Sequence, residues 1–290
     1  MSGVKPAWGA LPWLLALAAC SAEPLPLVMV PQDLDAAWHP DGQQVAIQHE
    51  GIDQPSGVYV VGVSPAERRL LMAGAYSPDW SPTGTDLVLG SGGQIFRVSL
   101  GSGEATAISD PEAWNGSPSW SPDGRWIAFS SNGGDSHSPP DLWIKDAESD
   151  LPARRVPIGG PPRDEMFDKD WSPSSDRIVV SVAGTPQRLF VTDLSGRDTA
   201  YITGGNADAE MPAWHPQEEW IAYVRSQNNY GDVWLIRSDG SEDHLLVRFA
   251  AYPSWSPDGQ RLAFTRPSDS TAAVWSVNLE GSDLQQLTFP

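Results

Sequence analysis

Six short segments of the chain, each ending in tryptophan, carry the residues best suited to binding chemistry. The tryptophans are Trp38, Trp80, Trp120, Trp171, Trp214 and Trp255. The residues just before them are acidic or aromatic: Asp33 and Asp35, Tyr76 and Asp79, Trp114 and Asn115, Phe167 and Asp168, Asp208 and Glu210, and Phe249 and Tyr252. Carboxylates and aromatic faces both attract cations, so this set predicts a site for a basic peptide segment or a cation. The alternative is that the carboxylates are solvated in loops and the aromatic rings pack on neighbouring elements.

Motifs for catalysis are scarce. The chain has no Gly-x-Ser-x-Gly nucleophile elbow, no His-Glu-x-x-His and no phosphate-binding Gly-x-x-x-x-Gly-Lys. Its five histidines are His39, His49, His137, His215 and His244, and their spacing forms no ligand set. We therefore predict no cofactor and no protein-bound metal, and the sequence favours a protein that is not an enzyme. A structural cation in a central channel stays open, although no compact calcium-loop motif occurs.

The tryptophans recur at steps of 42, 40, 51, 43 and 41 residues. Three apolar residues stand seven to nine positions after each one, which is typical of a strand buried on both faces. Between the tryptophan and this run lies a turn, such as Ser-Pro-Asp-Gly at 121–124 and 256–259 or His-Pro-Asp-Gly at 39–42. A second run and a weaker fourth segment, such as Arg69–Met72 or Leu245–Arg248, complete each unit.

Four short strands in a unit of 40–45 residues are the signature of a propeller blade. The sequence therefore predicts an all-β fold, a six-bladed β-propeller with four antiparallel strands per blade, over residues 28–290. A β-sandwich is the alternative, but sandwiches do not repeat at a fixed period. Two segments have the pattern of the strand that closes the ring, Leu27–Val30 and Leu284–Phe289, and the sequence does not choose between them.

The same residues carry a family resemblance. Trp-Ser-Pro-Asp-Gly followed by an apolar run and Leu-Trp-x-x-Asp resembles the WD40-like (PD40) repeat of TolB-type propellers, over about residues 27–290. The resemblance implies the fold more than the function, because similar repeats occur in scaffold proteins, in propellers of prolyl-oligopeptidase-like peptidases and in some lyases. TolB proteins carry an α/β domain before the propeller, and this chain resembles the propeller half alone.

The first 19 residues predict an export signal. Residues 7–19 are apolar apart from Gly9 and Pro12, too short a run to span a bilayer but fitting for a signal peptide. The run ends in Leu-Ala-Ala-Cys, which resembles the lipobox of bacterial lipoproteins, and Cys20 is the single cysteine. We therefore expect lipid attachment at Cys20 and a tether over residues 20–27. Ser21 follows in place of aspartate, which by the same resemblance implies the outer membrane, facing the periplasm. A cysteine buried by chance in a short signal or anchor helix is the alternative.

Composition narrows the class of partner. The formal net charge is −19, which argues against nucleic acid, since a basic stripe would be expected there. We expect a monomer that contacts the membrane through its lipid only and binds an envelope protein or peptide.

Function is expected on the face whose loops vary, because binding resides in unequal loops on a rigid scaffold. The third unit is the longest, and its excess lies in 154–170. The candidate partner-binding residues are Tyr76, Trp114, His137, Arg163, Glu165, Phe167, Asp168, Glu210 and Tyr252. The predicted function is a protein or peptide interaction scaffold. The alternatives are a propeller lyase or hydrolase acting on a saccharide or lactone at the channel mouth, and a carbohydrate-binding propeller without turnover.

Overall fold

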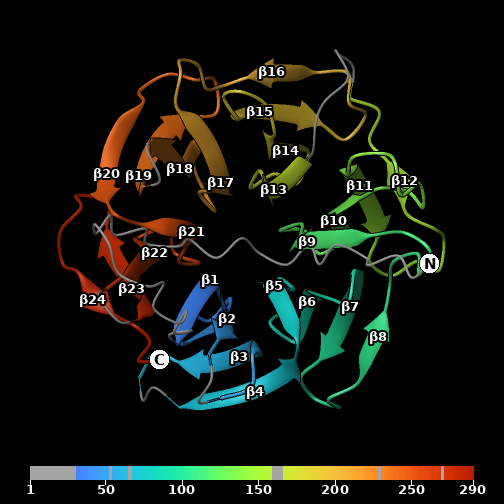
Figure 1. Ribbon diagram of the computed structural model, residues 1–290, viewed down its shortest axis with the longest axis horizontal. Coiled ribbons are helices and arrows are strands. Elements are labelled where there is room, and N and C mark those ends of the chain that lie inside the picture. Colours follow the sequence, from blue (N-terminus) through green and yellow to red (C-terminus); the bar gives the residue numbers. More distant parts are fainter. Residues whose placement is uncertain (1–30, 52–53, 65–66, 159–165, 228–229, 269–270) are drawn as a thin grey trace, which may run out of the picture.

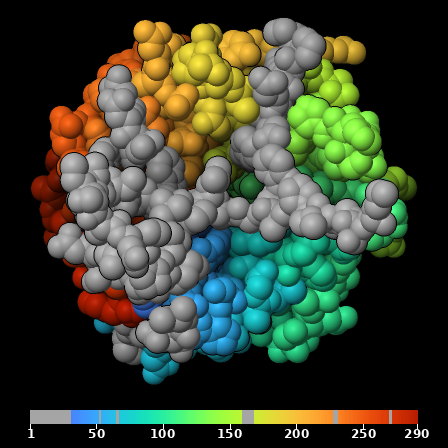
Figure 2. Space-filling model, in the orientation of Figure 1, coloured from blue at the N-terminus to red at the C-terminus, as the bar shows by residue number. Residues whose placement is uncertain are grey.

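The computed structural model describes residues 31–51, 54–64, 67–158, 166–227, 230–268 and 271–290. These residues form 24 β-strands, and the six strands that end at the repeat tryptophans surround the centre of a ring (Figure 1). We number the repeats one to six in chain order. The colours of Figure 2 follow that order around the ring, so that the last repeat lies beside the first. No helix in the described part of the chain is long and apolar enough to cross a membrane.

Each repeat contributes four strands, counted outward from the centre. The first strands are β1 (Gln32–Trp38), β5 (Ala75–Trp80), β9 (Asn115–Trp120), β13 (Met166–Trp171), β17 (Asp208–Trp214) and β21 (Ala251–Trp255). The second are β2 (Gln44–Glu50), β6 (Asp86–Ser91), β10 (Trp126–Ser131), β14 (Arg177–Val182), β18 (Trp220–Gln227) and β22 (Arg261–Pro267). The third are β3 (Gly57–Gly62), β7 (Gln94–Ser99), β11 (Asp141–Asp146), β15 (Arg188–Asp193), β19 (Tyr230–Arg237) and β23 (Ala272–Asn278). The outermost are β4 (Arg68–Ala73), β8 (Ala105–Ala107), β12 (Arg154–Arg155), β16 (Thr199–Tyr201), β20 (His244–Arg248) and β24 (Gln285–Gln286).

The strands pair as antiparallel meanders, which confirms the all-β propeller fold. The second to fifth repeats each form a separate four-stranded sheet. The first and last repeats instead share one eight-stranded sheet, because β1 and β23 pair in parallel at a single position, Gln32 with Ala272. Of the six four-stranded blades expected from the sequence, four are separate sheets of the described residues, and the first and last repeats are joined in the fifth sheet.

The last repeat completes its own meander. β24 pairs with β23, and just beyond β24 the carbonyl of Val274 accepts from the N–H groups of Leu287 and Thr288, while its N–H donates to Thr288 Oγ1. The segment 284–289 therefore supplies the fourth strand of the last repeat. The competing candidate, Leu27–Val30, lies outside the described residues.

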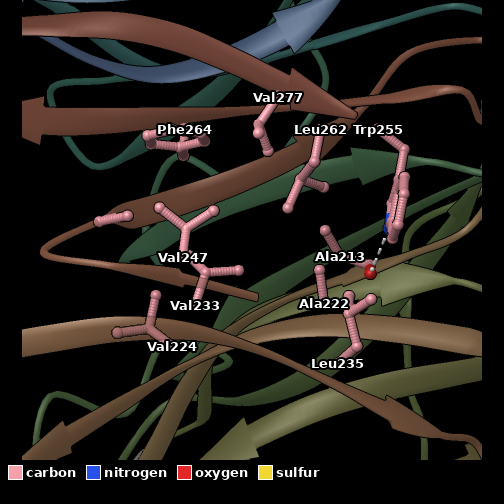
Figure 3. Packing of buried hydrophobic residues seen from close by; sticks show 11 residues of the cluster. Ala213, Ala222, Val224, Val233, Leu235, Val247, Trp255, Leu262, Phe264 and Val277 are labelled. Atoms are coloured by element: carbon pink, nitrogen blue, oxygen red, sulfur yellow. Dashed lines mark hydrogen bonds between the residues drawn. The ribbon is translucent and has the colours of Figure 1, made fainter. Parts of the chain in front are cut away.

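The core lies between neighbouring sheets. All eighteen apolar positions that follow the tryptophans by seven to nine residues are buried, as their pattern predicted. In Figure 3 the sheets of the fifth and sixth repeats pack through Ala222, Val233, Leu262 and Phe264. Each sheet thus buries one face against the sheet before it and the other against the sheet after it, and this double burial explains continuous apolar runs in place of alternation.

The repeat tryptophans fasten one sheet to the next. Trp255 donates its indole Nε1–H to the carbonyl of Ala213 in the preceding inner strand, at 3.0 Å (Figure 3). The same bond recurs in two more repeats, from Trp80 to Ala37 and from Trp171 to Ser119. Trp80, Trp171 and Trp255 are therefore framework residues, each held by packing and by one indole hydrogen bond to the preceding inner strand.

Candidate functional site: an acidic central channel

The inner strands share one irregularity, located two to four residues before each tryptophan. A β-bulge interrupts the pairing of all six inner strands with their second strands at this place. Five residues at this place have left-handed backbones: Asp35 (φ 49°), Ser77 (φ 47°), Ser117 (φ 48°), Met211 (φ 51°) and Tyr252 (φ 52°). Such conformations are uncommon for residues other than glycine and persist only where the surrounding structure enforces them. Bulges re-aim side chains, and here the bulged residues line the centre of the ring.

The space they enclose is a channel cavity of about 240 Å³. Its acidic lining comes from Asp35, Asp79, Asp168 and Asp170. Lys169 is the one cationic side chain among the lining residues that the structure describes. The arrangement is a concave site with an excess of negative charge, contributed by three different repeats.

Burial makes the ionised form of these carboxylates costly. Removal from water raises the pKa of Asp35 to about 7, and the neighbouring charges of Asp168 and Asp79 add to the rise. Burial likewise raises the pKa of Asp168, although Lys169 opposes the change. The pKa of Tyr252 is raised by burial and then by the charges of Asp35 and Asp168, which line the same cavity. A cation bound among these groups would relieve their mutual repulsion.

Lys169 is tied to the wall of the channel. Its Nζ donates a hydrogen bond of 2.8 Å to the carbonyl of Ser117, and its side chain is 7% exposed. Burial lowers the pKa of Lys169 to about 7, while Asp168 favours the charged form. The lining thus holds four carboxyl groups and one amine, so acidic groups outnumber basic ones in the channel.

Asp79 and Asp170 each bridge two neighbouring inner strands. Asp170 accepts the backbone N–H of Trp171 at 2.8 Å and that of Trp214, in the next repeat, at 2.7 Å. Asp79 forms the same bridge between Trp80 and Trp120. Burial raises the pKa of Asp79 to about 7 and that of Asp170 to about 6, against the pull of these donors. Both carboxylates join adjacent inner strands, in addition to lining the channel.

Two predicted aromatic residues of the channel mouth serve mainly to pack the sheets. Tyr76 lies on Gly90, where a β-carbon would come within 2.3 Å of its ring. Trp114 lies on Gly116 in the same way, at 2.9 Å. Asn115 is buried and donates to the carbonyls of its own loop and of a neighbouring one. These residues support the inner strands and do not line the channel cavity.

Glu210 lies close to the channel without lining its cavity. It accepts a hydrogen bond of 2.6 Å from Ser226, and burial raises its pKa, with further contributions from Asp168 and Asp208. Phe249, from the same predicted rim, is 56% exposed.

His137, by contrast, sits on an exposed loop, where its side chain is 94% exposed and lies 3.6 Å from Asp135. Arg163, Glu165, Cys20 and the side chain of Phe167 lie outside the described residues.

Asp33 was expected beside the channel, and the structure corrects this. Its side chain is fully buried, and it accepts from His49 Nδ1 at 2.8 Å and from Arg68. The second carboxylate oxygen of Asp33 and His49 Nε2 have no hydrogen-bond partner. The three side chains tie β1 to β2 and β4, so Asp33 and His49 are sequestered from any ligand in the channel.

His39 and His215 hold the turns of their repeats. His215 Nδ1 accepts the N–H groups of Gln217 and Glu218, its Nε2 lies 3.2 Å from the carbonyl of Gly259, and its ring meets Trp255 edge-on at 4.7 Å. His39 makes the equivalent contacts with the second repeat. Both therefore act in the turns. Within the described ranges, no group of three His, Cys, Asp or Glu side chains is placed to hold a metal ion.

Sequence reasoning missed several channel residues. Ser77, Ser117, Lys169, Asp170 and Met211 line the cavity and were not singled out. A proline follows three of the bulged positions that carry Ser or Met, and a fourth follows Tyr252. Aligning the six segments on their tryptophans shows this recurrence, which is the signal that could have located the lining.

Comparisons with known proteins agree with the fold. The family profile described as "TolB beta propeller domain" (PD40) matches residues 34–249. The uncharacterized protein Atu1656 of Agrobacterium fabrum is 28% identical over 216 residues, which cover 66% of this chain and 69% of that protein.

Solved structures show the same architecture. TolB from Acinetobacter baumannii superposes with a TM-score of 0.69 at 15% identity, covering 87% of this chain and 62% of that one. Oligogalacturonate lyase from Vibrio parahaemolyticus gives 0.63 at 12% identity, covering 90% and 79%. At such identities these likenesses show the fold alone.

Proposed function

Because the chain belongs to the TolB beta propeller domain family, we propose that it is a binding protein whose acidic channel takes a basic peptide segment of a partner in the cell envelope. One observation carries the proposal. Asp35 of the first repeat and Asp168 of the fourth line one cavity, which Tyr252 also lines. A lysine or arginine side chain entering there would meet two carboxylates and an aromatic ring.

We also propose that the ring works as six blades. The eight-stranded sheet contains two complete meanders joined by one parallel pair, so each meander can act as a blade. Six equivalent bulges around one channel support this count. A rigid ring of this kind holds the channel carboxylates at fixed separations, which favours a specific partner over a loose polycation.

Attachment to the membrane is a separate proposal. Lipid on Cys20, after removal of residues 1–19, would hold the propeller at the outer membrane on its periplasmic side. Metabolic labelling with an alkyne analogue of palmitate tests it, since Cys20→Ser should abolish the label and retain the larger precursor. Label that persists in Cys20→Ser would contradict the proposal.

The lyase or hydrolase alternative depended on histidine and carboxylate meeting at the channel mouth. His49 is only 2% exposed and is bound to Asp33, so it has no access to a substrate there. His137 contacts Asp135 on its own loop. The geometry of the described residues therefore supports binding better than turnover.

The direct test is calorimetric titration with a capped tetralysine peptide. The Asp35→Asn/Asp168→Asn double variant should weaken binding by at least about tenfold, because two charge-assisted contacts are lost. The double variant Asp135→Asn/Asp239→Asn removes two exposed carboxylates outside the channel lining and serves as the charge-matched control. Wild-type affinity should also fall as the pH drops from 8 to 5.5, since the raised pKa of Asp35 means protonation below about 7. Equal binding by the double variant and the wild type would refute the channel as the site.

A further inference from the structure

A second cavity, of about 290 Å³, lies where the last repeat meets the first. Its walls include Trp38, Pro40 and Gly42 of the first repeat, and Pro257 and Asp258 of the last. We call it the seam pocket. It opens among the turns that follow the repeat tryptophans and is distinct from the carboxylates of the channel, although Trp38 borders both cavities.

The seam pocket occupies a position that other junctions fill with a ring. A β-carbon on Gly84 would come 2.3 Å from His39 Nε2, and one on Gly259 would come 2.4 Å from His215 Nε2. At a third junction, Gly124 faces the ring of Pro82 at 3.8 Å. Gly42 is the equivalent turn glycine of the first repeat, and nothing lies within 4 Å of its β-carbon position. The preceding repeat offers Ser256 where the first and fifth repeats have histidine.

Trp38 also departs from its counterparts. The five other repeat tryptophans are between 2% and 7% exposed, whereas Trp38 is only partly buried. Its indole Nε1 is buried and, like that of Trp214, has no hydrogen-bond partner. In three other repeats this N–H donates to a backbone carbonyl of the preceding inner strand. Trp38 is therefore the repeat tryptophan that combines partial exposure with an unpartnered Nε1, and it lines the seam pocket together with Gly42.

We propose that the seam pocket binds a proline-containing segment of a partner protein, with a basic residue next to the proline. The equivalent spaces are filled by imidazole or pyrrolidine rings, so a proline ring against Gly42 fits the space by size. A carbonyl of the same segment would accept the Nε1–H of Trp38, as backbone carbonyls do for Trp80, Trp171 and Trp255. Walls of tryptophan and proline are the usual surface for proline-rich peptides.

Charge complementarity specifies the neighbour of that proline. Asp41 and Asp258 stand on the two sides of the pocket, one from each repeat. Arg261, the cation that also lines the pocket, donates to Asp283 and to Ser276, so its charge is already balanced. The pocket therefore keeps an excess of negative charge, which favours arginine or lysine beside the proline and disfavours an acidic segment.

The experiment uses two capped peptides, Arg-Pro-Pro-Arg and Arg-Ala-Ala-Arg, titrated by calorimetry into the full chain carrying Asp35→Asn and Asp168→Asn. This background weakens the channel, so that the difference between the peptides reports the seam pocket. The proline peptide should bind at least about tenfold more tightly than its alanine counterpart. Adding Trp38→Phe removes the indole N–H and should reduce that affinity by about fivefold. Trp171→Phe is the matched control, because its indole already bonds within the protein and lies elsewhere.

Ser256→His gives an independent result. It should place an imidazole against Gly42, as His39 and His215 do at their junctions, raising the melting temperature while blocking the proline peptide. If Ser256→His is folded and still binds the peptide as tightly, or if Trp38→Phe binds like its parent, the seam pocket is not the site. Equal binding of the proline and alanine peptides would also overturn the proposal. Ser256 lines the seam pocket and not the channel, so the Ser256→His result is independent of the channel, which the tetralysine titration tests by itself.

Discussion

The two ends of each inner strand contribute differently to the stability of the fold. At the tryptophan end, five of the six tryptophans are buried, and Trp171 is fully hydrogen-bonded: its indole reaches Ser119 and its backbone N–H reaches Asp170. At the bulge end, Asp35 and Tyr252 adopt left-handed backbones, and carboxylates crowd one another. The tryptophan end therefore stabilises the fold, and the bulge end costs stability, as expected where a rigid frame holds a strained binding site.

The strongest way to break the frame is to truncate a repeat tryptophan. Trp171→Ala should lower the free energy of unfolding by about 3–5 kcal/mol, because a large cavity forms and the bond to Ser119 is lost. Urea unfolding followed by circular dichroism measures this. Trp38→Ala should cost about 1–2 kcal/mol, since Trp38 is partly exposed and its Nε1 makes no bond. Equal losses of unfolding free energy for the two variants would show that the junction between the last and first repeats is packed like the other junctions.

The next effect concerns Asp170, the channel carboxylate that bridges two neighbouring inner strands. Asp170→Ala leaves the buried N–H groups of Trp171 and Trp214 without acceptors and should destabilise the fold by about 2 kcal/mol. Asp239→Ala, at an exposed turn, is the control and should change stability by less than about 0.5 kcal/mol. An unchanged unfolding midpoint for Asp170→Ala would show that water or a neighbouring group replaces the carboxylate.

Asp35→Asn should act in the opposite direction. The native pKa of Asp35, about 7, lies above the ordinary 3.8, so the folded state holds its proton more tightly than the unfolded state. The cost of ionisation therefore grows as pH rises from about 4 to 7 and is complete above 7. The variant should be more stable than the wild type by about 1–2 kcal/mol at pH 8, and the gain should shrink toward pH 5. Urea unfolding at pH 8, 6 and 5 tests the sign, and a loss of stability at pH 8 would contradict it.

The smallest effect is expected at His137. Its side chain is almost fully exposed, so His137→Ala should change the unfolding free energy by less than about 0.5 kcal/mol. The same variant should leave tetralysine binding unchanged, because the channel lining does not include it. A clear loss of peptide affinity would extend the binding surface from the channel to this loop.

The sequence predicted burial and channel lining correctly where the type of a residue alone determines its environment. Triplets such as Ile221, Ala222 and Tyr223 had to be buried, and each one is. Asp35, Asp168 and Tyr252 stood out as acidic or aromatic residues before a tryptophan, and they line the channel. Residue type was a poor guide for Tyr76 and Trp114, because their rings pack over Gly90 and Gly116 and do not line the channel cavity.

Other features depended on pairing between distant segments. The inward aim of Ser117 and Met211 follows from the bulges, which exist only once each inner strand has paired with its neighbour. The burial of Asp33 required His49 and Arg68 to meet it, and the open space at Gly42 is visible only by comparison with three filled junctions. Such relations arise from the assembled ring and have no local pattern.

The single parallel pair between Gln32 and Ala272 has a consequence for how the protein folds. Every other strand pair joins residues that are close in sequence, so each meander can form soon after its own segment is available. The ring can close only when the last strands reach the first, which makes this junction the slowest native contact to form and the first to open. Amide hydrogens of β1 and β23 that face the junction should therefore exchange sooner than those of β10 or β14, in the middle of their own sheets.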